Sequence, residues 1–352
     1  MENTVRLKID GKDVTARAGA TVLEAARAAG IFIPSLCYHP DLEPFGVCRI
    51  CTVEIEGRGH TISCTLPATE GLVVKTHGPT IDRVRKLAVE LIIANHDVDC
   101  LACSSNDHCE LQRLANLVGI DRGRLDRLRK GTRHLPIDTS NPFFDRDHNR
   151  CVHCGICVRT CAEIQGTNAI SFAYRGYDTL VCTFADKPIL ESRCESCGEC
   201  VARCPVGSLV PKNYERPTRE VQTVCTFCGV GCNIHLGVRG DRVVGVRADE
   251  DNVVNRGSLC VKGRYGFEFI HDPARLTTPL VRRDGALAPA TWDEALDEVA
   301  AKLEGYANEP GTETNRFGAL ASARTTNEDN YVFQKFVRAV MGTNNLDHCA
   351  RL

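Results

Sequence analysis

Cysteine is the residue type in this sequence with the greatest capacity for chemistry. The chain has 352 residues and 21 cysteines, most of which fall in groups separated by only two or three positions. Disulfide-rich proteins are usually short and secreted, whereas this chain is long and its N-terminus lacks the apolar core of a secretory signal. Closely spaced thiols in such a chain more often hold metal. The composition therefore predicts several thiolate-ligated metal centres.

One spacing of four cysteines occurs twice. The runs CVHCGICVRTC (151–161) and CESCGECVARCP (194–205) both have the form C-x2-C-x2-C-x3-C. In bacterial ferredoxins with this run, three cysteines hold one 4Fe–4S cube and the fourth reaches across to the other cube. A pair of zinc knuckles fits less well, because structural zinc usually takes two C-x2-C pairs. The spacing predicts two crossed ligand sets: Cys151, Cys154, Cys157 and Cys204 for one cluster, and Cys161, Cys194, Cys197 and Cys200 for the other.

Two groups precede this repeat. The first, C-x10-C-x2-C-x12-C, suits a planar 2Fe–2S cluster on a β-rich segment, with zinc as the alternative. The second, H-x3-C-x2-C-x5-C, begins with a histidine; a lone histidine near cysteines is usually incidental, and His108 is a competing candidate. The candidate ligands are Cys37, Cys48, Cys51 and Cys64 in the first group, and His96, Cys100, Cys103 and Cys109 in the second.

A last group follows the repeat and consists of Cys225, Cys228, Cys232 and Cys260. Its spacing alone permits either a 4Fe–4S cluster or a zinc ribbon. Two cysteines remain outside all groups. Cys182 is expected to be a small buried hydrophobic residue, and Cys349 is not expected to bind metal.

The N-terminal elements that must position these residues can be predicted from the hydrophobic pattern. VRLKIDGKDVTA indicates a hairpin that turns at Asp10-Gly11, and TVLEAARAAG (21–30) indicates a helix. CTVEIEG and GLVVKT add strands, and residues 80–95 have helical apolar periodicity. The charged residues 121–140 are expected to be a linker, and the stretch between the two cysteine runs is expected to form strands.

After Pro217 the pattern changes to that of an α/β unit. Thr291 and Glu294 form a capping box for the helix WDEALDEVAAKLEGY. RFGALASA predicts a buried strand, and NEDNYVFQKFVRAVMG predicts a helix capped by Asn327 and ended by Gly342.

Charge and hydropathy argue against several classes of partner. A net charge of −2 gives no reason to expect nucleic acid or an anionic membrane surface. No apolar run approaches the roughly 20 residues that a membrane span needs. The expected location is the cytoplasm.

The order of the cysteine groups, and the residues around them, resemble the catalytic alpha subunit of cytosolic NAD-dependent molybdenum formate dehydrogenase. H-x3-C-x2-C-x5-C occurs in that family and in NADH dehydrogenase and hydrogenase relatives, with the histidine as a cluster ligand. CTFCGVGCN, followed by NRGSLCVKGRYG, resembles the 4Fe–4S entrance module of molybdopterin-guanine-dinucleotide oxidoreductases. The resemblance implies that His96 is a ligand and raises its cluster's potential, as histidine does in Rieske centres. It also implies that Lys262 is an electron relay between cluster and pterin; a solvated surface charge is the alternative.

The fold class implied by the resemblance is an α+β multidomain chain. The expected parts are a β-grasp 2Fe–2S ferredoxin-like domain (1–79), a helical domain with the histidine-ligated 4Fe–4S cluster (80–120), the linker (121–140), a double 4Fe–4S ferredoxin module (141–216), a 4Fe–4S entrance domain (217–275) and the beginning of an α/β molybdopterin oxidoreductase domain (276–352).

The activity implied by the resemblance is formate oxidation at molybdenum held by bis(molybdopterin guanine dinucleotide). Electrons would pass one at a time through one 2Fe–2S and four 4Fe–4S clusters to an FMN- and NAD-binding iron–sulfur subunit, with a small 2Fe–2S subunit as a further partner. The tail SARTTNEDNYVFQKFVRAVMGTNNLDHCARL looks like that family's approach to its molybdenum ligand. The sequence is therefore expected to be the N-terminal part of a longer enzyme whose formate site lies beyond Leu352.

Three other interpretations remain open. The large subunit of respiratory NADH dehydrogenase matches the first 110 residues or so, but it would not normally supply all eight ferredoxin cysteines. An iron-only hydrogenase shares the front half but lacks the CTFCGVGCN module. A zinc-stabilised interaction scaffold would have no redox role, and metal analysis would distinguish it.

Overall fold

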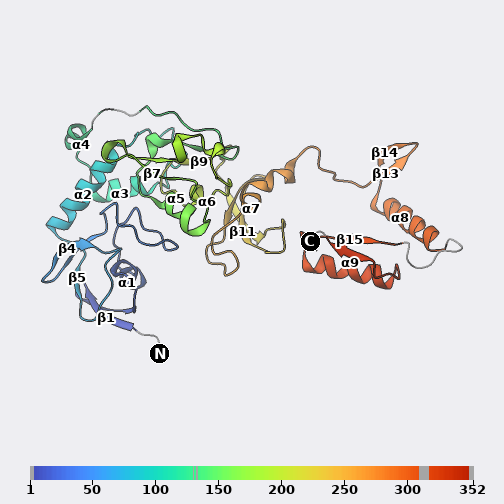
Figure 1. The fold of residues 1–352 in the computed structure, drawn as a ribbon, viewed down its shortest axis with the longest axis horizontal. Coiled ribbons are helices and arrows are strands. Elements are labelled where there is room, and N and C mark those ends of the chain that lie inside the picture. The colour runs from blue at the N-terminus through green and yellow to red at the C-terminus, as the bar shows by residue number, and fades with distance from the viewer. Residues whose placement is uncertain (1–3, 130, 132–133, 309–316, 349–352) are drawn as a thin grey trace. The chain divides into compact units, whose positions relative to one another are not determined.

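The computed structural model describes residues 4–129, 131, 134–308 and 317–348. By its internal contacts the chain divides into two compact units, Met1–Tyr214 and Glu215–Leu352. Figure 1 traces the elements of both units in chain order. Within the described residues, no helix is long and apolar enough to cross a membrane.

The first unit begins with a five-stranded sheet in the order β2-β1-β5-β3-β4. The predicted hairpin and helix are confirmed, and β1 also pairs in parallel with β5, which is the β-grasp arrangement. The strand after the Cys51 turn pairs with a second strand, GHTI. The sequence did not indicate this second strand, because its residues are exposed or half-buried and it lacks an apolar pattern. The elements are β1 (Thr4–Ile9), β2 (Lys12–Arg17), α1 (Val22–Ala28), β3 (Thr52–Ile55), β4 (Gly59–Ile62) and β5 (Val73–Lys75).

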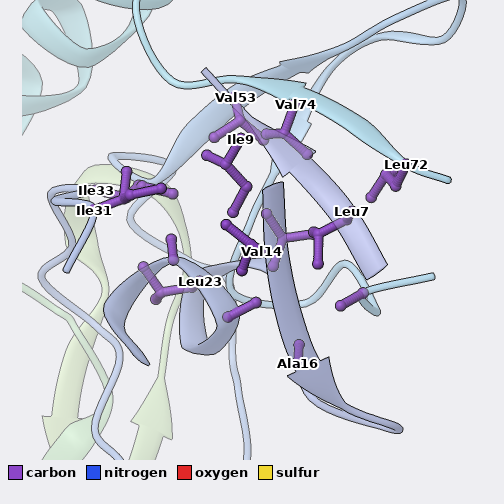
Figure 2. Close-up of a cluster of buried hydrophobic side chains, with 14 of the residues drawn as sticks. Leu7, Ile9, Val14, Ala16, Leu23, Ile31, Ile33, Val53, Leu72 and Val74 are labelled. Carbon is purple, nitrogen blue, oxygen red and sulfur yellow. The ribbon is translucent and has the colours of Figure 1, made fainter. Parts of the chain in front are cut away.

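The core of this sheet domain lies between the sheet and α1. Figure 2 shows the side chains of Ile9 and Val14 lying between Leu23 of α1 and the strand residues Val53 and Val74. Ile9, Leu23, Val53 and Val74 have no exposed surface. Burial of these side chains stabilises the sheet whose loops carry the first four cysteines.

Three helices follow the sheet: α2 (Pro79–Ala94), α3 (Glu110–Val118) and α4 (Arg122–Leu128). The helix expected at 80–95 is confirmed, but the expectation of a linker at 121–140 is wrong for its first part. Glu90 of α2 is completely buried and accepts a hydrogen bond from the Asp121 amide at 3.2 Å, and Asp121 caps α4. Because α4 buries only Leu125, the apolar pattern among its charged residues is too weak to predict a helix.

The remainder of the first unit consists of short elements around the two cysteine runs. One helix begins inside each cysteine run, α5 in the first and α6 in the second. The strands expected between the runs form the β7–β8 hairpin. The elements are β6 (Phe144–Arg146), η1 (His148–Arg150), α5 (Ile156–Arg159), η2 (Thr160–Ile164), β7 (Ser171–Ala173), η3 (Gly176–Asp178), β8 (Leu180–Cys182), η4 (Phe184–Asp186), η5 (Ile189–Glu191), α6 (Glu199–Ala202) and β9 (Leu209–Pro211).

The second unit starts with a three-stranded antiparallel sheet, β10-β11-β12, and continues with smaller pairs of strands and two longer helices. β13 and β14 form a hairpin, and β15 pairs in parallel with β16. The elements are β10 (Arg219–Val224), β11 (Asn233–Arg239), β12 (Arg242–Ala248), α7 (Val261–Tyr265), η6 (Gly266–His271), β13 (Leu280–Arg283), β14 (Ala286–Pro289), α8 (Trp292–Ala307), β15 (Ala319–Ala321), α9 (Asn327–Ala339) and β16 (Leu346–His348).

Two predictions for the last elements need correction. The cap of α9 is Thr326, not Asn327, because the Thr326 hydroxyl accepts a hydrogen bond from the Asp329 amide at 3.1 Å and the Asp329 carboxylate accepts one from the Thr326 amide. The strand predicted as buried forms, but Leu320 is 84% exposed; among the described residues, β15 pairs only with the short β16. The Thr291–Glu294 capping box of α8 is confirmed.

Candidate metal centres

The first four cysteines lie together in the sheet domain. Cys37, Cys48, Cys51 and Cys64 are all buried. Hydrogen bonds from the Cys48 and Cys64 thiols lower the pKa of Cys37 and of Cys51 to about 6, and burial opposes this shift. The same hydrogen bonds and burial raise the pKa of Cys48 and Cys64. The group therefore favours two thiolates even without metal, and thiolate is the form that binds iron.

Two buried arginines fix the loops of this group from outside the sheet domain. Arg85 of α2 donates to the Ile50 carbonyl at 3.1 Å and to the Thr52 carbonyl at 2.8 Å, on either side of Cys51. Arg159 of α5 donates to the Cys37 carbonyl at 2.6 Å. Neither contact could be predicted from the amino-acid pattern, because each joins residues more than 30 positions apart.

The histidine group also forms one site. His96, Cys100, Cys103 and Cys109 line a single pocket, whereas the competitor His108 is exposed and does not line it. Burial lowers the pKa of His96, so the imidazole is neutral, which is the form that ligates metal. Its Nδ1 atom is buried without a hydrogen-bond partner in the described part of the chain. A buried imidazole nitrogen without a partner, in a pocket with three thiols, fits the ligand set of an iron–sulfur cluster.

Gly207, three residues after Cys204, lies in the ferredoxin segment and lines this pocket. A β-carbon added at Gly207 would lie 2.4 Å from the Cys103 sulfur, a separation that side chains essentially never show. The glycine thus permits a close approach that no other residue allows.

Replacing Gly207 with alanine should therefore disturb the Cys103 site. We expect Gly207→Ala to lose the iron of that one site, about four atoms per chain, as measured by iron analysis of anaerobically purified protein. Gly123→Ala is the matched control, because its β-carbon would meet nothing closer than 3.5 Å. Normal iron content and unchanged paramagnetic resonance in Gly207→Ala would contradict this expectation.

The structure brings cysteines of the two runs together in the crossed arrangement, and their assignment as cluster ligands stays a prediction. Cys204 of the second run lines the same pocket as Cys151, Cys154 and Cys157 of the first run. Conversely, the charge of Cys161 acts on the thiols of Cys194 and Cys200. The two groups are adjacent, since Cys157 of one group is also influenced by Cys200 of the other.

The backbone repeats the same unusual conformation in both runs. Gly155 and Gly198 begin α5 and α6 with a φ of 74°, in the left-handed region that favours glycine. The amides of His153 and Ser196 each point to a cysteine sulfur, Cys151 and Cys194 respectively, at 3.4 Å. This turn wraps amide donors around the sulfurs, which suits anionic thiolates.

Burial raises the pKa of the thiols in these two groups. It raises the pKa of Cys204 to about 11 and that of Cys154, Cys157 and Cys200 further. Four thiols so placed do not ionise together without a compensating positive charge. Iron ions would supply that charge.

The last group lies at the start of the second unit. The Cys225 amide donates to the Cys232 carbonyl at 2.8 Å. Burial raises the pKa of both thiols, and the neighbouring Cys228 and Cys260 raise it further, so the four thiols share one site. Cys260 caps α7, and Lys262 is exposed on its first turn.

The two cysteines outside the groups differ in what the structure says of them. Cys182 is buried, as predicted, and burial together with the Asp186 carboxylate raises its pKa to about 12. Cys349 lies outside the described residues. In the described part of the chain, no three His, Cys, Asp or Glu side chains are arranged to hold a single metal ion.

Family models match the chain from end to end in five segments. The matches are a 2Fe-2S iron-sulfur cluster binding domain (2–79), the NADH-ubiquinone oxidoreductase-G iron-sulfur binding region (85–124), the ferredoxin-like domain of NADH-quinone oxidoreductase subunit 3 (141–210), the molybdopterin oxidoreductase Fe4S4 domain (218–272) and molybdopterin oxidoreductase (275–352). Segments that resemble iron–sulfur domains of NADH-quinone oxidoreductases thus precede segments that resemble molybdopterin oxidoreductases. These matches support 2Fe–2S and 4Fe–4S centres in this chain.

Several curated proteins are similar over nearly the whole chain. A G-type subunit of NADH-quinone oxidoreductase from Rhizobium meliloti and the alpha subunit of NADPH-Fe(3+) oxidoreductase from Geobacter sulfurreducens are each 38% identical over 99% of this chain. YrhE of Bacillus subtilis, provisionally named a formate dehydrogenase, is 31% identical over 99%. The chain spans about 40% of the length of each of these relatives.

A solved structure shares part of the fold. The NAD+-reducing [NiFe]-hydrogenase in its H2-reduced state is similar with a TM-score of 0.54 and 35% identity. The similarity covers 59% of this chain and 87% of the hydrogenase chain.

Proposed function

We propose that this chain is the electron-transfer part of a formate dehydrogenase alpha subunit. The observation that carries the proposal is the order of domains: three iron–sulfur segments precede segments that match the molybdopterin oxidoreductase Fe4S4 domain and molybdopterin oxidoreductase. Such an order would supply a series of one-electron centres to a molybdenum domain of the same chain. The provisional name of the Bacillus subtilis relative is consistent with formate as substrate.

The five clusters would be held by the residues that the structure groups together. Cys37, Cys48, Cys51 and Cys64 would hold the 2Fe–2S cluster. The four 4Fe–4S clusters would be held by His96 with Cys100, Cys103 and Cys109; by Cys151, Cys154, Cys157 and Cys204; by Cys161, Cys194, Cys197 and Cys200; and by Cys225, Cys228, Cys232 and Cys260.

The chain's own residues would fix the spacing and the potentials of these centres. Arg159 joins the helix of Cys157 to the loop of Cys37, and Gly207 joins the segment of Cys204 to Cys103. Each contact links two ligand groups through a few bonded or packed atoms. Lys262, two residues after Cys260, would relay electrons between the last cluster and a pterin. When bound, the molybdenum–pterin group would supply the two-electron oxidation of formate to carbon dioxide.

The test is the choice of electron donor by the full-length enzyme. Formate added without air should reduce the clusters and generate their paramagnetic resonance signals in the isolated subunit. NADH and NADPH should do so only when an FMN-bearing partner subunit is present. No reduction by formate in a molybdenum-loaded enzyme would overturn the proposal.

A second candidate is supported by the identities of the relatives. The two proteins that are 38% identical are named for NADH-quinone and NADPH-Fe(3+) oxidoreduction, not for formate. In that case the same clusters would carry electrons away from a nicotinamide cofactor, and the molybdopterin domain would have another role. Cluster reduction by NADPH through the partner subunit, with none by formate, would favour this candidate.

A further inference from the structure

Arg146 is a buried arginine outside the ligand groups, and its charge opposes the rise that burial causes in the pKa of Cys194, a member of one of them. Arg146 ends β6, where its amide and carbonyl each bond with Asp138 at 3.0 Å, and its side chain is 7% exposed. One guanidinium nitrogen, Nη2, lies 3.1 Å from the Asp138 carboxylate. Asp138 is itself held by the Ser140 hydroxyl and the Ile189 amide, so the arginine has a fixed anchor.

The other two nitrogens of Arg146 are not paired with any of the described residues. Nε and Nη1 are buried and make no hydrogen bond within the described residues. Burying charged donors without acceptors is costly, so an arginine retained in this state implies an acceptor nearby. The side chain also borders a wider hollow at the surface, but solvent there does not reach these two atoms.

One of the two cavities that Arg146 lines contains the first of the two crossed cysteine groups. Its wall includes Cys151, Cys154, Cys157 and Cys204 together with Arg146. A 4Fe–4S cluster on those thiols would present sulfide and thiolate sulfurs, which are acceptors, to the free donors. The arginine would then be satisfied on both sides, by Asp138 and by the cluster.

We propose that Arg146 donates hydrogen bonds to the cluster on Cys151, Cys154, Cys157 and Cys204 and thereby raises its reduction potential. The inference rests on the proposed function, because it requires that this thiol group hold a cluster. When the cluster accepts one electron, its negative charge increases by one. A fixed positive charge whose donors bond to the sulfurs would stabilise the reduced state more than the oxidised state.

A redox titration of the anaerobically purified chain tests the proposal. In Arg146→Gln, the ratio of reduced to oxidised cluster at the wild-type midpoint should fall about tenfold, which for one electron is a shift of 59 mV to lower potential. Arg146→Lys keeps the charge but not the fork of donors, so a smaller shift in the same direction is expected. Arg175→Gln, which removes an exposed arginine of the same module, should leave the potential unchanged.

A second measurement reports the hydrogen bond itself. Exchangeable protons coupled to the reduced cluster should be detected by electron–nuclear double resonance in the wild type, and those contributed by Arg146 should be lost in Arg146→Gln, whereas the coupling of the His153 amide should remain. If both Arg146 variants show cluster signals with unchanged potential and unchanged proton couplings, the inference about Arg146 is overturned, whereas the proposed function is not. If the wild type lacks a cluster on these four cysteines, the proposed function fails with it. If Arg146→Gln does not load a cluster, the potential and proton couplings of Arg146→Lys test the inference instead.

Discussion

Replacing Cys161 with alanine should remove the cluster held by Cys194, Cys197 and Cys200 and leave the cluster of its sequence neighbours Cys151, Cys154 and Cys157 intact. The reason is the crossing, since the thiol of Cys161 acts on Cys194 and Cys200 while Cys204 lines the other pocket. Iron analysis of anaerobically purified protein should show a loss of about four atoms per chain.

Double variants identify which cluster is lost. Cys161→Ala combined with Cys194→Ala should lose no more iron than either change alone, because both residues would serve one cluster. Cys161→Ala combined with Cys151→Ala should lose about eight atoms, from two clusters. Cys182→Ala is the control, because this buried cysteine belongs to no ligand group. Loss of eight atoms in the first pair and four in the second would refute the crossed assignment.

Replacing His96 with cysteine should keep a 4Fe–4S cluster but lower its reduction potential. Thiolate adds a negative charge where neutral imidazole adds none, so the electron is held less strongly. Histidine ligation raises potentials by hundreds of millivolts in Rieske centres, where two histidines contribute, so a decrease of about 100 mV or more is expected for one.

The measurement is a redox titration followed by paramagnetic resonance, with His108→Cys as the matched control. His108 is exposed and does not line the pocket of Cys100, Cys103 and Cys109. Its replacement should leave every potential unchanged. An unchanged potential in His96→Cys would remove His96 from the ligand set.

The ligand groups could be predicted from sequence because iron–sulfur ligands are close together along the chain. Spacing alone suggested the crossing of Cys161 and Cys204, and the structure brings these residues to the groups expected. Spacing did not decide between His96 and His108 as the ligand. That choice required the resemblance to a family. The structure separates the two by burial, because only His96 lines the thiol pocket.

The residues around the sites could not be predicted because their contacts are long-range. Arg159 and Cys37 are separated by 122 positions, and nothing near Arg159 in the sequence indicates the carbonyl that it binds. Gly207 is an ordinary glycine until folding places Cys103 against it. Arg146 has no recognisable motif around it, because its function depends on Asp138 and on a cavity formed by both cysteine runs.

Errors in the element predictions have local causes. Helix α4 has a single buried side chain, Leu125, among charged residues, so its amphipathic pattern was too weak to distinguish it from a linker. At α9 the predicted cap is Asn327, but the reciprocal hydrogen bonds between Thr326 and Asp329 show that the cap is the preceding threonine.

The central claim is that the grouped thiols hold iron and inorganic sulfide for electron transfer. Its most direct test is metal and sulfide analysis of freshly made protein purified without air, with paramagnetic resonance recorded during stepwise reduction. One 2Fe–2S and four 4Fe–4S clusters predict about 18 iron atoms and as many acid-labile sulfides per chain, with several distinct signals. A colourless protein that contains zinc alone and gives no signal on reduction would contradict the claim.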